Sequence, residues 1–295
     1  MLDAMNDAVK RLIGHSSMKV PELQSGVSDL ILFQSSVTTP IEAALHEPAI
    51  GLILQGEKEI CWGNTVERIG PGSSVIVSHD LPVMSRVTRA SERQPYRSIV
   101  FVFGQPIVRG LIDKLEIEDD RDTKSLALSV SKAEPDFLDA LSRYLNLASG
   151  SSEASVLAPL IRTELHYRAL VAPHGAMLRR AANRNDHAAR IGLAVTHLRK
   201  NYRLSLHVSE LAAISKMSVS SFHTHFRAVT ATTPIQYQKD LRLIEARRML
   251  RDEEATVAEA ANAVGYESTT QFTREFRRKY GKPPREERSS WRNNT

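Results

Sequence analysis

The chain has 295 residues, which is more than one ordinary globular domain usually holds, so its length predicts two domains. No apolar run approaches the ~20 residues that cross a bilayer, and the opening MLDAMNDAVKRLIGHSS lacks the apolar core of a secretory signal; we therefore expect a cytoplasmic protein with no membrane partner. The single cysteine, Cys61, excludes an internal disulfide and a zinc site built on several cysteines.

The net charge of +5 is unevenly distributed along the chain. From Asp186 to Thr295 there are 19 Lys and Arg against 12 Asp and Glu, whereas the remainder has 20 against 22. A basic C-terminal part joined to a near-neutral part predicts a module that binds a polyanion, attached to a domain with another task.

The segment from about Asp29 to Phe103 has the pattern of a series of short strands. Runs rich in β-branched and aromatic residues lie at 30–36, 49–55, 58–62, 74–78 and 97–103. Gly63-Asn64 and Pro71-Gly72 are turn signals between such runs. Many short strands at this spacing predict a small antiparallel barrel or sandwich.

Helical spacing of apolar residues follows, in the segments 106–117, 134–148 and 153–171. Pro159 is expected to kink the last of these, whose apolar stripe could either form a homodimer face or cover the barrel. The stretch 171–186 is rich in small, polar and basic residues and is predicted to be a linker. We therefore expect an N-terminal domain over 1–180 and a C-terminal domain over 186–295.

The C-terminal part contains an internal repeat with an offset of 50 residues. Each copy has a short apolar helix (208–214; 257–264), a brief turn and an amphipathic helix opened by a serine that can cap it. This order is that of a helix-turn-helix unit, whose second helix enters the major groove of DNA. The matched positions are Ser218 with Ser268, Phe222 with Phe272, Phe226 with Phe276, Arg227 with Arg277, and Pro234 with Pro284.

The outward face of the second copy distinguishes DNA binding from a plain helical bundle with duplicated packing. Its short hydrogen-bonding side chains and the long guanidinium side chain of Arg274 are suited to contacts with base edges, and the basic run that follows is suited to contacts with phosphates. A bundle has no need of these groups together. The base-facing set is Thr269, Thr270, Thr273 and Arg274, and the basic run is Arg277, Arg278, Lys279, Lys282, Arg285 and Arg288.

The segment VAEAANAVGYESTTQFTREFRRKYGKPP (257–284) resembles the second helix-turn-helix of the AraC/XylS family of transcription regulators. The resemblance extends to a first unit at 211–237 and a connecting helix at 240–252, and covers about 186–288. The N-terminal part resembles a cupin-like sensor domain of that family, on the segments 47–60, 70–83 and 93–103. The resemblance implies a two-domain α+β protein, with an N-terminal cupin-like β-barrel flanked by helices and an all-α C-terminal domain with two helix-turn-helix units.

The resemblance also implies which residues touch DNA. In the first recognition helix it implies base contacts from Ser220, His223 and Thr224, with Arg227 reaching a phosphate. In the second it implies base contacts from Thr269, Thr270, Thr273 and Arg274, while Arg277 and Lys279 are expected to contact phosphates because they belong to the basic run. The first helix departs from the strongest readers of the family, because it has no Trp or Arg at its base-facing positions. His223 could instead be an ordinary surface or packing histidine, and His225 is expected to be one.

The cupin resemblance raises the question of a metal enzyme, which would need about three convergent ligands. His46 and His79 are the only histidines of the strand region and do not form a His-x-His pair. We therefore expect no metal, no cofactor and no catalytic residue, and a barrel interior that binds a small-molecule effector. His46, His79, Met84 and Trp62 could line it, and Cys61 could be either a core residue or a thiol sensor.

These observations predict a sequence-specific, DNA-binding transcription regulator controlled by a small-molecule effector. Its partners would be double-stranded DNA, the effector and RNA polymerase, with a second copy of the chain as a further candidate. The alternative is a cupin-type metal enzyme tethered to a DNA-binding domain.

Overall fold

The structure is a computed structural model that describes residues 1–14, 27–63, 65–115, 126–148, 152–183, 186–252 and 255–287. The strands of these residues are β1 (Leu30–Ser35), β2 (Glu42–His46), β3 (Ala49–Gln55), β4 (Glu57–Trp62), β5 (Thr65–Ile69), β6 (Ser73–Val77), β7 (Leu81–Arg89), β8 (Tyr96–Val102) and β9 (Leu128–Lys132). The helices that accompany them are α1 (Leu2–Ile13), α2 (Gln105–Ile112), α3 (Pro135–Leu147), α4 (Ala154–Val171) and α5 (Gly175–Ala182).

The strands form two antiparallel sheets, with the orders β1-β8-β3-β6-β9 and β2-β7-β4-β5. The expected α+β class is confirmed. The barrel, however, is not closed, because no hydrogen-bonded ladder joins the two sheets in the part of the chain that the structure describes. Gly63, in the predicted hairpin turn between β4 and β5, has a φ of +54°, while its partner Asn64 lies outside the described residues.

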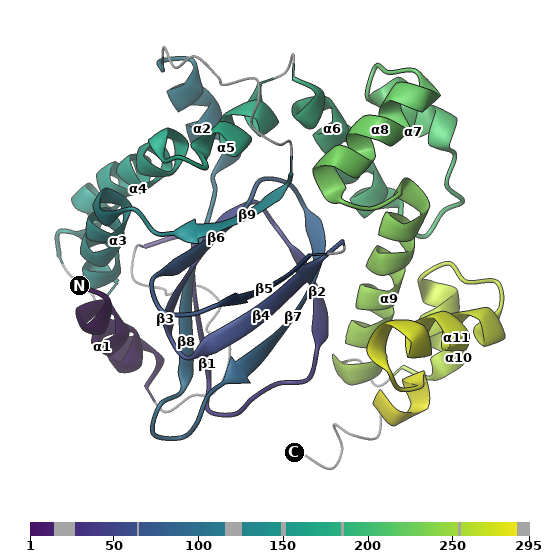
Figure 1. Ribbon diagram of the computed structural model, residues 1–295, viewed down its shortest axis with the longest axis horizontal. Coiled ribbons are helices and arrows are strands. Elements are labelled where there is room, and N and C mark those ends of the chain that lie inside the picture. The colour runs from purple at the N-terminus through teal and green to yellow at the C-terminus, as the bar shows by residue number, and fades with distance from the viewer. Residues whose placement is uncertain are drawn as a thin grey trace.

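The first sheet is buried on both faces, which explains the nearly continuous apolar sequence of β3. Ile50, Leu52 and Leu54 pack with α1, α3 and α4 in one core. Ile53 points the other way and packs between the sheets with Trp62 and other residues of the second sheet. The helices therefore cover one face of this sheet, and the second sheet covers the other (Figure 1).

Three of these helices differ from the sequence prediction. Helix α1 was not anticipated; it buries Met5, Ala8, Val9 and Ile13, whose spacing of three and four residues places them on one face. Helix α5, with 8 residues, occupies half of the stretch 171–186 that was expected to be a linker. The helix predicted at 106–117 corresponds to α2, which ends earlier, at Ile112. Residues 116–125 lie outside the described part.

The remaining helices are α6 (His187–Asn201), α7 (Val208–Ile214), α8 (Val219–Thr230), α9 (Pro234–Asp252), α10 (Val257–Ala263) and α11 (Thr269–Tyr280). We call residues 1–183 the sheet part and residues 186–287 the helical part. Helix α9 runs between two helix-turn-helix units, α7–α8 at one end and α10–α11 at the other (Figure 1). No helix of the described residues has both the length and the apolar character needed to span a membrane.

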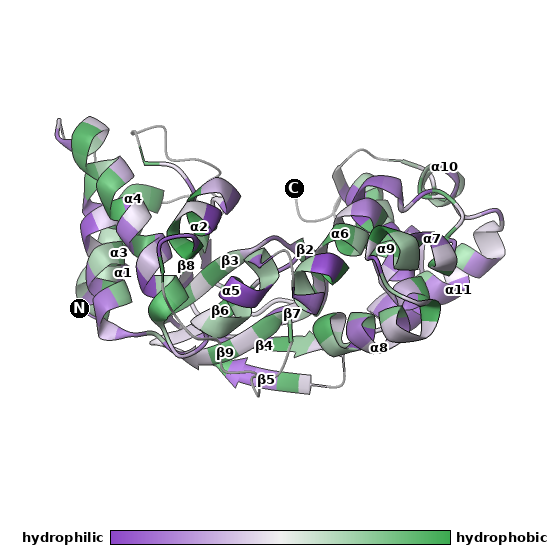
Figure 2. Cartoon of the chain, turned by 90° about the horizontal axis from the view of Figure 1, so that it is seen from above, coloured by the Kyte–Doolittle hydropathy of each residue, from purple (hydrophilic) through white to green (hydrophobic). Residues whose placement is uncertain are grey.

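The cores of the two units differ in their surroundings. The second unit has its own core around Phe272, Phe276 and Val264. The core of the first unit, which includes Phe222 and Phe226, is continuous with the residues between the two sheets. Figure 2 shows the helical part lying against the sheet part on the side of β2 and β7. The domain boundary near 180–186 therefore stays a prediction, since packing is continuous across it.

Candidate nucleic-acid interface

The recognition helix of the first unit is α8, and Ser218 caps its start by accepting a hydrogen bond from the backbone N–H of Ser221 at 3.3 Å. Phe222 and Phe226 are fully buried, which fixes the opposite face toward solvent. The four residues predicted to touch DNA are all exposed on that face: Ser220, His223, Thr224 and Arg227.

The recognition helix of the second unit, α11, repeats this geometry. Ser268 accepts from the backbone N–H of Gln271 at 3.3 Å, and Phe272 and Phe276 are fully buried. The outer face of α11 is a shallow, open groove, which places the predicted base-reading residues in one patch beside two further arginines. The groove is lined by Thr269, Thr270, Thr273, Arg274, Arg277, Arg278 and Gly281.

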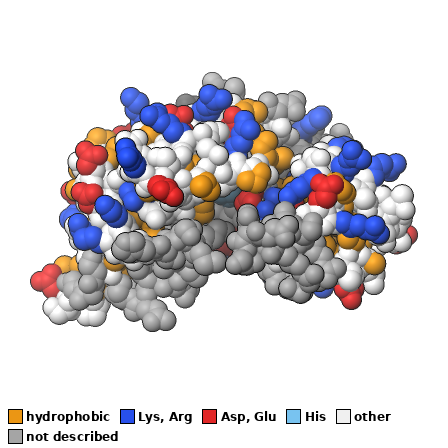
Figure 3. All heavy atoms as spheres, turned by 90° about the horizontal axis from the view of Figure 1, so that it is seen from below, with side chains coloured by type: hydrophobic (Ala, Val, Ile, Leu, Met, Phe, Trp, Pro, Cys, Tyr) orange, Lys and Arg blue, Asp and Glu red, His pale blue; other side chains and the backbone are white. Residues whose placement is uncertain are grey.

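The arginines on these two faces make no ion pair with any described residue, whereas Arg247, Arg251 and Lys279 of the same helical part are each paired with a carboxylate. The arginines of the two faces are Arg227 on α8 and Arg274, Arg277 and Arg278 on α11. The view from below shows Lys and Arg side chains along the right-hand side, over the helical part (Figure 3). Unpaired guanidinium groups on an exposed helix face are suited to phosphates and base edges.

Lys279 differs from the other predicted contacts. Its ammonium lies 2.6 Å from the carboxylate of Asp240 on α9, and only 10% of its side chain is exposed. Lys282, part of the same basic run, lies 3.0 Å from the buried carboxylate of Glu287. The structure therefore turns part of the basic run inward, where it holds α11 against its neighbours, and Arg288 lies outside the described residues.

Tyr266 and Glu275, two residues of the segment 257–284 that carries the family resemblance, make buried polar contacts within the second unit. Glu275 is 5% exposed and accepts hydrogen bonds from Lys239 Nζ and Tyr266 Oη, both at 2.8 Å. Burial alone would raise the pKa of Glu275, but the hydrogen bonds from Lys239 and Tyr266 outweigh it and the pKa is lowered. Glu275 thus stays ionised and fixes α11 on α9.

His225 faces away from the recognition surface of α8. Its ring stacks on that of His187 at the start of α6, with centroids 3.9 Å apart and planes at 19°. Burial and the neighbouring His187 lower the pKa of His225. This pair joins α8 to the first helix of the helical part.

The sheet part and the helical part meet in a polar seam. Arg199 on α6 forms ion pairs with Glu47 and Asp80 of the sheet part, the latter at 3.0 Å. Tyr237 at the start of α9 donates a hydrogen bond from its hydroxyl to the backbone carbonyl of Asp80 at 2.6 Å. His79, expected to line an effector pocket, lies within this seam and forms part of the wall of a cavity there.

Both ring nitrogens of His79 are engaged, by Ser78 Oγ and by the carbonyl of Ala188, at 2.9 Å each. Burial lowers the pKa of His79 to about 4, so the ring is neutral at physiological pH. This cavity, of about 370 Å³, lies between the β6–β7 loop, α2 and α6, and its walls also include Arg109 and Arg199.

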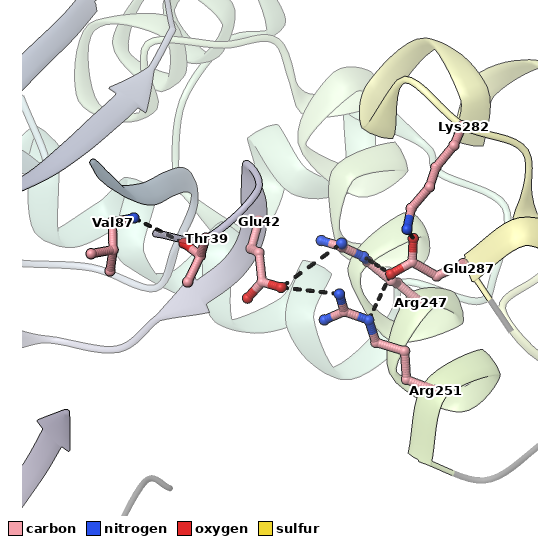
Figure 4. A network of polar contacts seen from close by, with 7 residues as sticks. All are labelled: Thr39, Glu42, Val87, Arg247, Arg251, Lys282 and Glu287. Atoms are coloured by element: carbon pink, nitrogen blue, oxygen red, sulfur yellow. Dashed lines mark hydrogen bonds and ion pairs between the residues drawn. The ribbon is translucent and has the colours of Figure 1, made fainter. Parts of the chain in front are cut away.

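A second contact joins the two parts at the other end of α9 (Figure 4). Arg251 Nη2 lies 3.0 Å from Glu42 of β2, and its Nε lies 2.6 Å from Glu287. Arg247 also pairs with Glu287, at 2.8 Å. The network therefore links the edge of the second sheet, the end of α9 and the segment after α11.

The other candidates in the sheet part have separate surroundings. Trp62 is 7% exposed and packs between the sheets, and His46 is partly buried at the end of β2. Met84 pairs with Cys61 across the β4–β7 ladder, on the face opposite to Trp62. Burial and the nearby Glu59 raise the pKa of the Cys61 thiol, which disfavours the reactive thiolate. Among the described residues, no three His, Cys, Asp or Glu side chains gather as a metal site.

Comparison with known proteins gives the same organisation. A solved apo form of a ToxT variant from Vibrio cholerae is 10% identical, with a TM-score of 0.57, covering 88% of this chain and 96% of that one. A fatty-acid-bound ToxT from the same organism has a TM-score of 0.52 at 10% identity, covering 88% of this chain and 94% of that one. These likenesses show that the two-part fold is shared.

Sequence relatives match the helical part. The HTH-type transcriptional activator RhaS of Escherichia coli is 29% identical over 104 residues, which are 35% of this chain and 37% of RhaS. The uncharacterized HTH-type regulator YobQ of Bacillus subtilis is 35% identical over 80 residues, 27% of this chain and 33% of YobQ. The match therefore spans little more than a third of these relatives.

Two family profiles divide the chain between them. A helix-turn-helix domain profile matches residues 211–290, which include both recognition helices. The profile described as the AraC-type transcriptional regulator N-terminus matches residues 26–177, over half of the chain. With a tandem pair of helix-turn-helix units behind that N-terminal domain, the protein belongs to the AraC-type family of DNA-binding transcription regulators.

Proposed function

We propose that the protein docks α8 and α11 in successive major grooves on one face of DNA, with α11 the stronger reader of sequence. The observation that carries this proposal is the pair of equivalent exposed faces whose arginines have no ion-pair partner in the described part of the chain. Three such arginines lie on α11 and one on α8, so the second unit offers more charge to DNA.

The roles of individual residues follow from their positions on these faces. On α11, Thr269, Thr270, Thr273 and Arg274 contact base edges, while Arg277 and Arg278 contact phosphates. On α8, Ser220, His223 and Thr224 face the bases and Arg227 a phosphate. Lys279, predicted as a phosphate contact, acts instead by holding α11 to α9, as its ion pair with Asp240 supports.

A small-molecule effector controls this binding by changing how the sheet part docks on α6 and α9. The seam contacts of Arg199 and Arg251 support this route, and the cavity beside His79 offers a place for the ligand at the seam itself. A ToxT structure with the same fold holds an unsaturated fatty acid, which makes an organic acid the first ligand class to try. Arg109 would meet its carboxylate.

The protein acts in the cytoplasm, where its DNA lies, by binding and without catalysis. A homodimer forms through α4, whose outer face exposes apolar side chains without a described neighbour to cover them; Val156 is 67% and Leu160 64% exposed. Contact with RNA polymerase then links DNA binding to transcription.

The docking proposal is tested by hydroxyl-radical footprinting of the full chain on a duplex selected from a random library. Two protected segments about 34 Å apart on one face are expected. Protection of a single segment would show that only one unit docks. For the effector, a fatty acid should raise the melting temperature of the wild type more than that of Arg109→Ala, and equal shifts would remove Arg109 from the site.

Arg274→Ala tests base reading by α11. The substitution should weaken binding to the selected site by about 1–3 kcal/mol and relax preference at one base pair. Arg277→Ala is the matched control, because loss of a phosphate contact should weaken all sequences about equally. Equal weakening of all sequences by Arg274→Ala would make that residue a phosphate contact.

A further inference from the structure

The middle of α9 carries a guanidinium that the DNA-binding surface does not use. Arg242 donates four hydrogen bonds to backbone carbonyls: Nε to Tyr202 at 2.7 Å, Nη1 to Gly265 at 2.8 Å, and Nη2 to Arg203 at 3.2 Å and Leu204 at 3.0 Å. None of these acceptors is a carboxylate. The side chain thus holds these backbone segments in a fixed relative position, because the N–H donors of a guanidinium lie in one rigid plane.

The carbonyls that accept hydrogen bonds from Arg242 belong to two separate segments. Residues 202–204 lie in the loop between α6 and α7, which leads into the first unit and whose Tyr202 and Leu206 pack against the core of that unit, whereas Gly265 lies in the turn between α10 and α11 of the second. The two segments also touch directly. Gly265 has a φ of +87°, and a Cβ added there would lie 2.2 Å from the carbonyl oxygen of Arg203. The turn of the second unit therefore lies against the α6–α7 loop, with no room for a side chain.

This junction matters because the cores of the two units are separate. Phe222 and Phe226 belong to one cluster, and Phe272 and Phe276 to another. The two clusters are connected by Tyr202, which packs against both, and by α9, which contributes Leu241 to the first and Leu243 to the second, so the apolar connection between the units runs through residues next to Arg242. Gln238, one turn before Arg242, adds hydrogen bonds to the carbonyls of Tyr202 and Leu204, but it does not reach the second unit.

We propose that Arg242 is the positioning residue that sets the angle and spacing between the two recognition helices, and thereby the spacing of the two DNA segments that the protein reads. The inference rests on the proposed docking in two successive grooves. When the two units are held rigidly relative to one another, binding of the first recognition helix presents the second to its groove at a higher effective concentration than in a flexible arrangement. A variant whose units move relative to one another should therefore lose affinity only on DNA that engages both units.

The test compares wild type, Arg242→Gln, Arg242→Lys and Arg248→Gln in the full chain. Arg248 is the matched control, because it lies on the same helix, is exposed and pairs with Glu245 three residues before it. The probes are a duplex selected by the wild type from a random library, the same duplex with 2 base pairs inserted between the two segments, and a duplex that keeps the α11 segment alone. Two inserted pairs rotate one segment by about 70° relative to the other.

Arg242→Gln should weaken binding to the selected duplex by about tenfold, leave binding to the single-segment duplex within about twofold, and reduce the penalty of the insertion. Arg242→Lys keeps the positive charge but not the planar guanidinium, and should change the affinity for each duplex in the same direction as Arg242→Gln. Arg248→Gln should match the wild type. If Arg242→Gln does not fold, as judged by circular dichroism, Arg242→Lys decides.

Two results overturn different claims. If the wild type binds the inserted duplex as well as the selected one, the docking in two fixed grooves is wrong. If the wild type discriminates and the Arg242 variants discriminate just as strongly, or lose the same factor on all three duplexes, the docking stands and the positioning role of Arg242 is wrong.

Discussion

Glu287 should be among the most sensitive single residues for the stability of the helical part, and Glu287→Gln tests this. The carboxylate is fully buried and faces three cations. One oxygen lies 2.8 Å from Arg247 and 2.6 Å from Arg251, and the other lies 3.0 Å from Lys282. Glutamine keeps the shape but removes the charge, leaving two largely buried guanidinium groups short of a counter-ion.

Breaking a buried ion pair by removing one partner costs about 3–5 kcal/mol. Glutamine retains one oxygen that can accept a hydrogen bond, and Glu42 still faces Arg251 at 3.0 Å, so we expect a loss at the lower end, about 3 kcal/mol. Glu286→Gln is the control, because the neighbouring carboxylate is exposed and its loss should change the free energy of unfolding by less than about 0.5 kcal/mol. Denaturant unfolding of the full chain at pH 7 measures both.

The same substitution predicts a pH dependence with a definite sign. Burial alone would raise the pKa of Glu287, but Arg247, Lys282 and Arg251 outweigh it and hold the pKa below its ordinary value of 4.5. The stabilisation is therefore fully present above pH 4.5 and is lost as the pH falls through the lowered pKa. The difference between wild type and Glu287→Gln should shrink in that acid range. A difference below 1 kcal/mol at pH 7, or one that persists unchanged in acid, would refute this account.

Three further substitutions have sharp expectations. Gly265→Ala places a Cβ 2.2 Å from the carbonyl of Arg203 at a φ of +87°, so thermal unfolding should show a loss of more than about 2 kcal/mol; an unchanged midpoint would mean that the junction yields easily. Phe272→Ala should cost about 3–5 kcal/mol by chemical unfolding and abolish protection of the α11 segment, and retained protection would argue against that assignment. Arg278→Ala should lower the slope of log affinity against log salt by about one in salt titrations, whereas an unchanged slope would exclude a phosphate contact.

The recognition helices could be predicted from the sequence because their signals are local. A capping serine, two phenylalanines four residues apart and an outward polar face lie within one short segment, and the 50-residue repeat displays that segment twice. The pairing of Lys279 could not be predicted, because Asp240 lies 39 positions away and only the fold brings the two together. Sequence alone does not separate an outward lysine from one that holds a neighbouring helix.

The sheet part was predicted less completely, for a related reason. Strands β2, β5, β7 and β9 were not anticipated, because they are short, partly exposed or interrupted by polar residues, and gain their order from neighbours in the sheets. Helix α5 has the composition of a linker, yet it buries Met177 and Leu178. The role of Arg242 was likewise hidden, since its four acceptors are backbone carbonyls that carry no sequence signal.

Helix α9 is where regulation and DNA reading meet, and the energies involved limit how control can work. An exposed ion pair such as Arg199 with Glu47 is worth at most about 1 kcal/mol, whereas coupling between two ligands of a regulator is typically about 1–3 kcal/mol. One such contact therefore cannot carry the response. The seam also contains the buried His79 with Ala188 and the Tyr237 hydroxyl on Asp80, at the opposite end of α9 from Arg251. An effector that shifts the sheet part must change several of these contacts together, and because they bracket Arg242, such a change acts on the helix that spaces the two recognition helices.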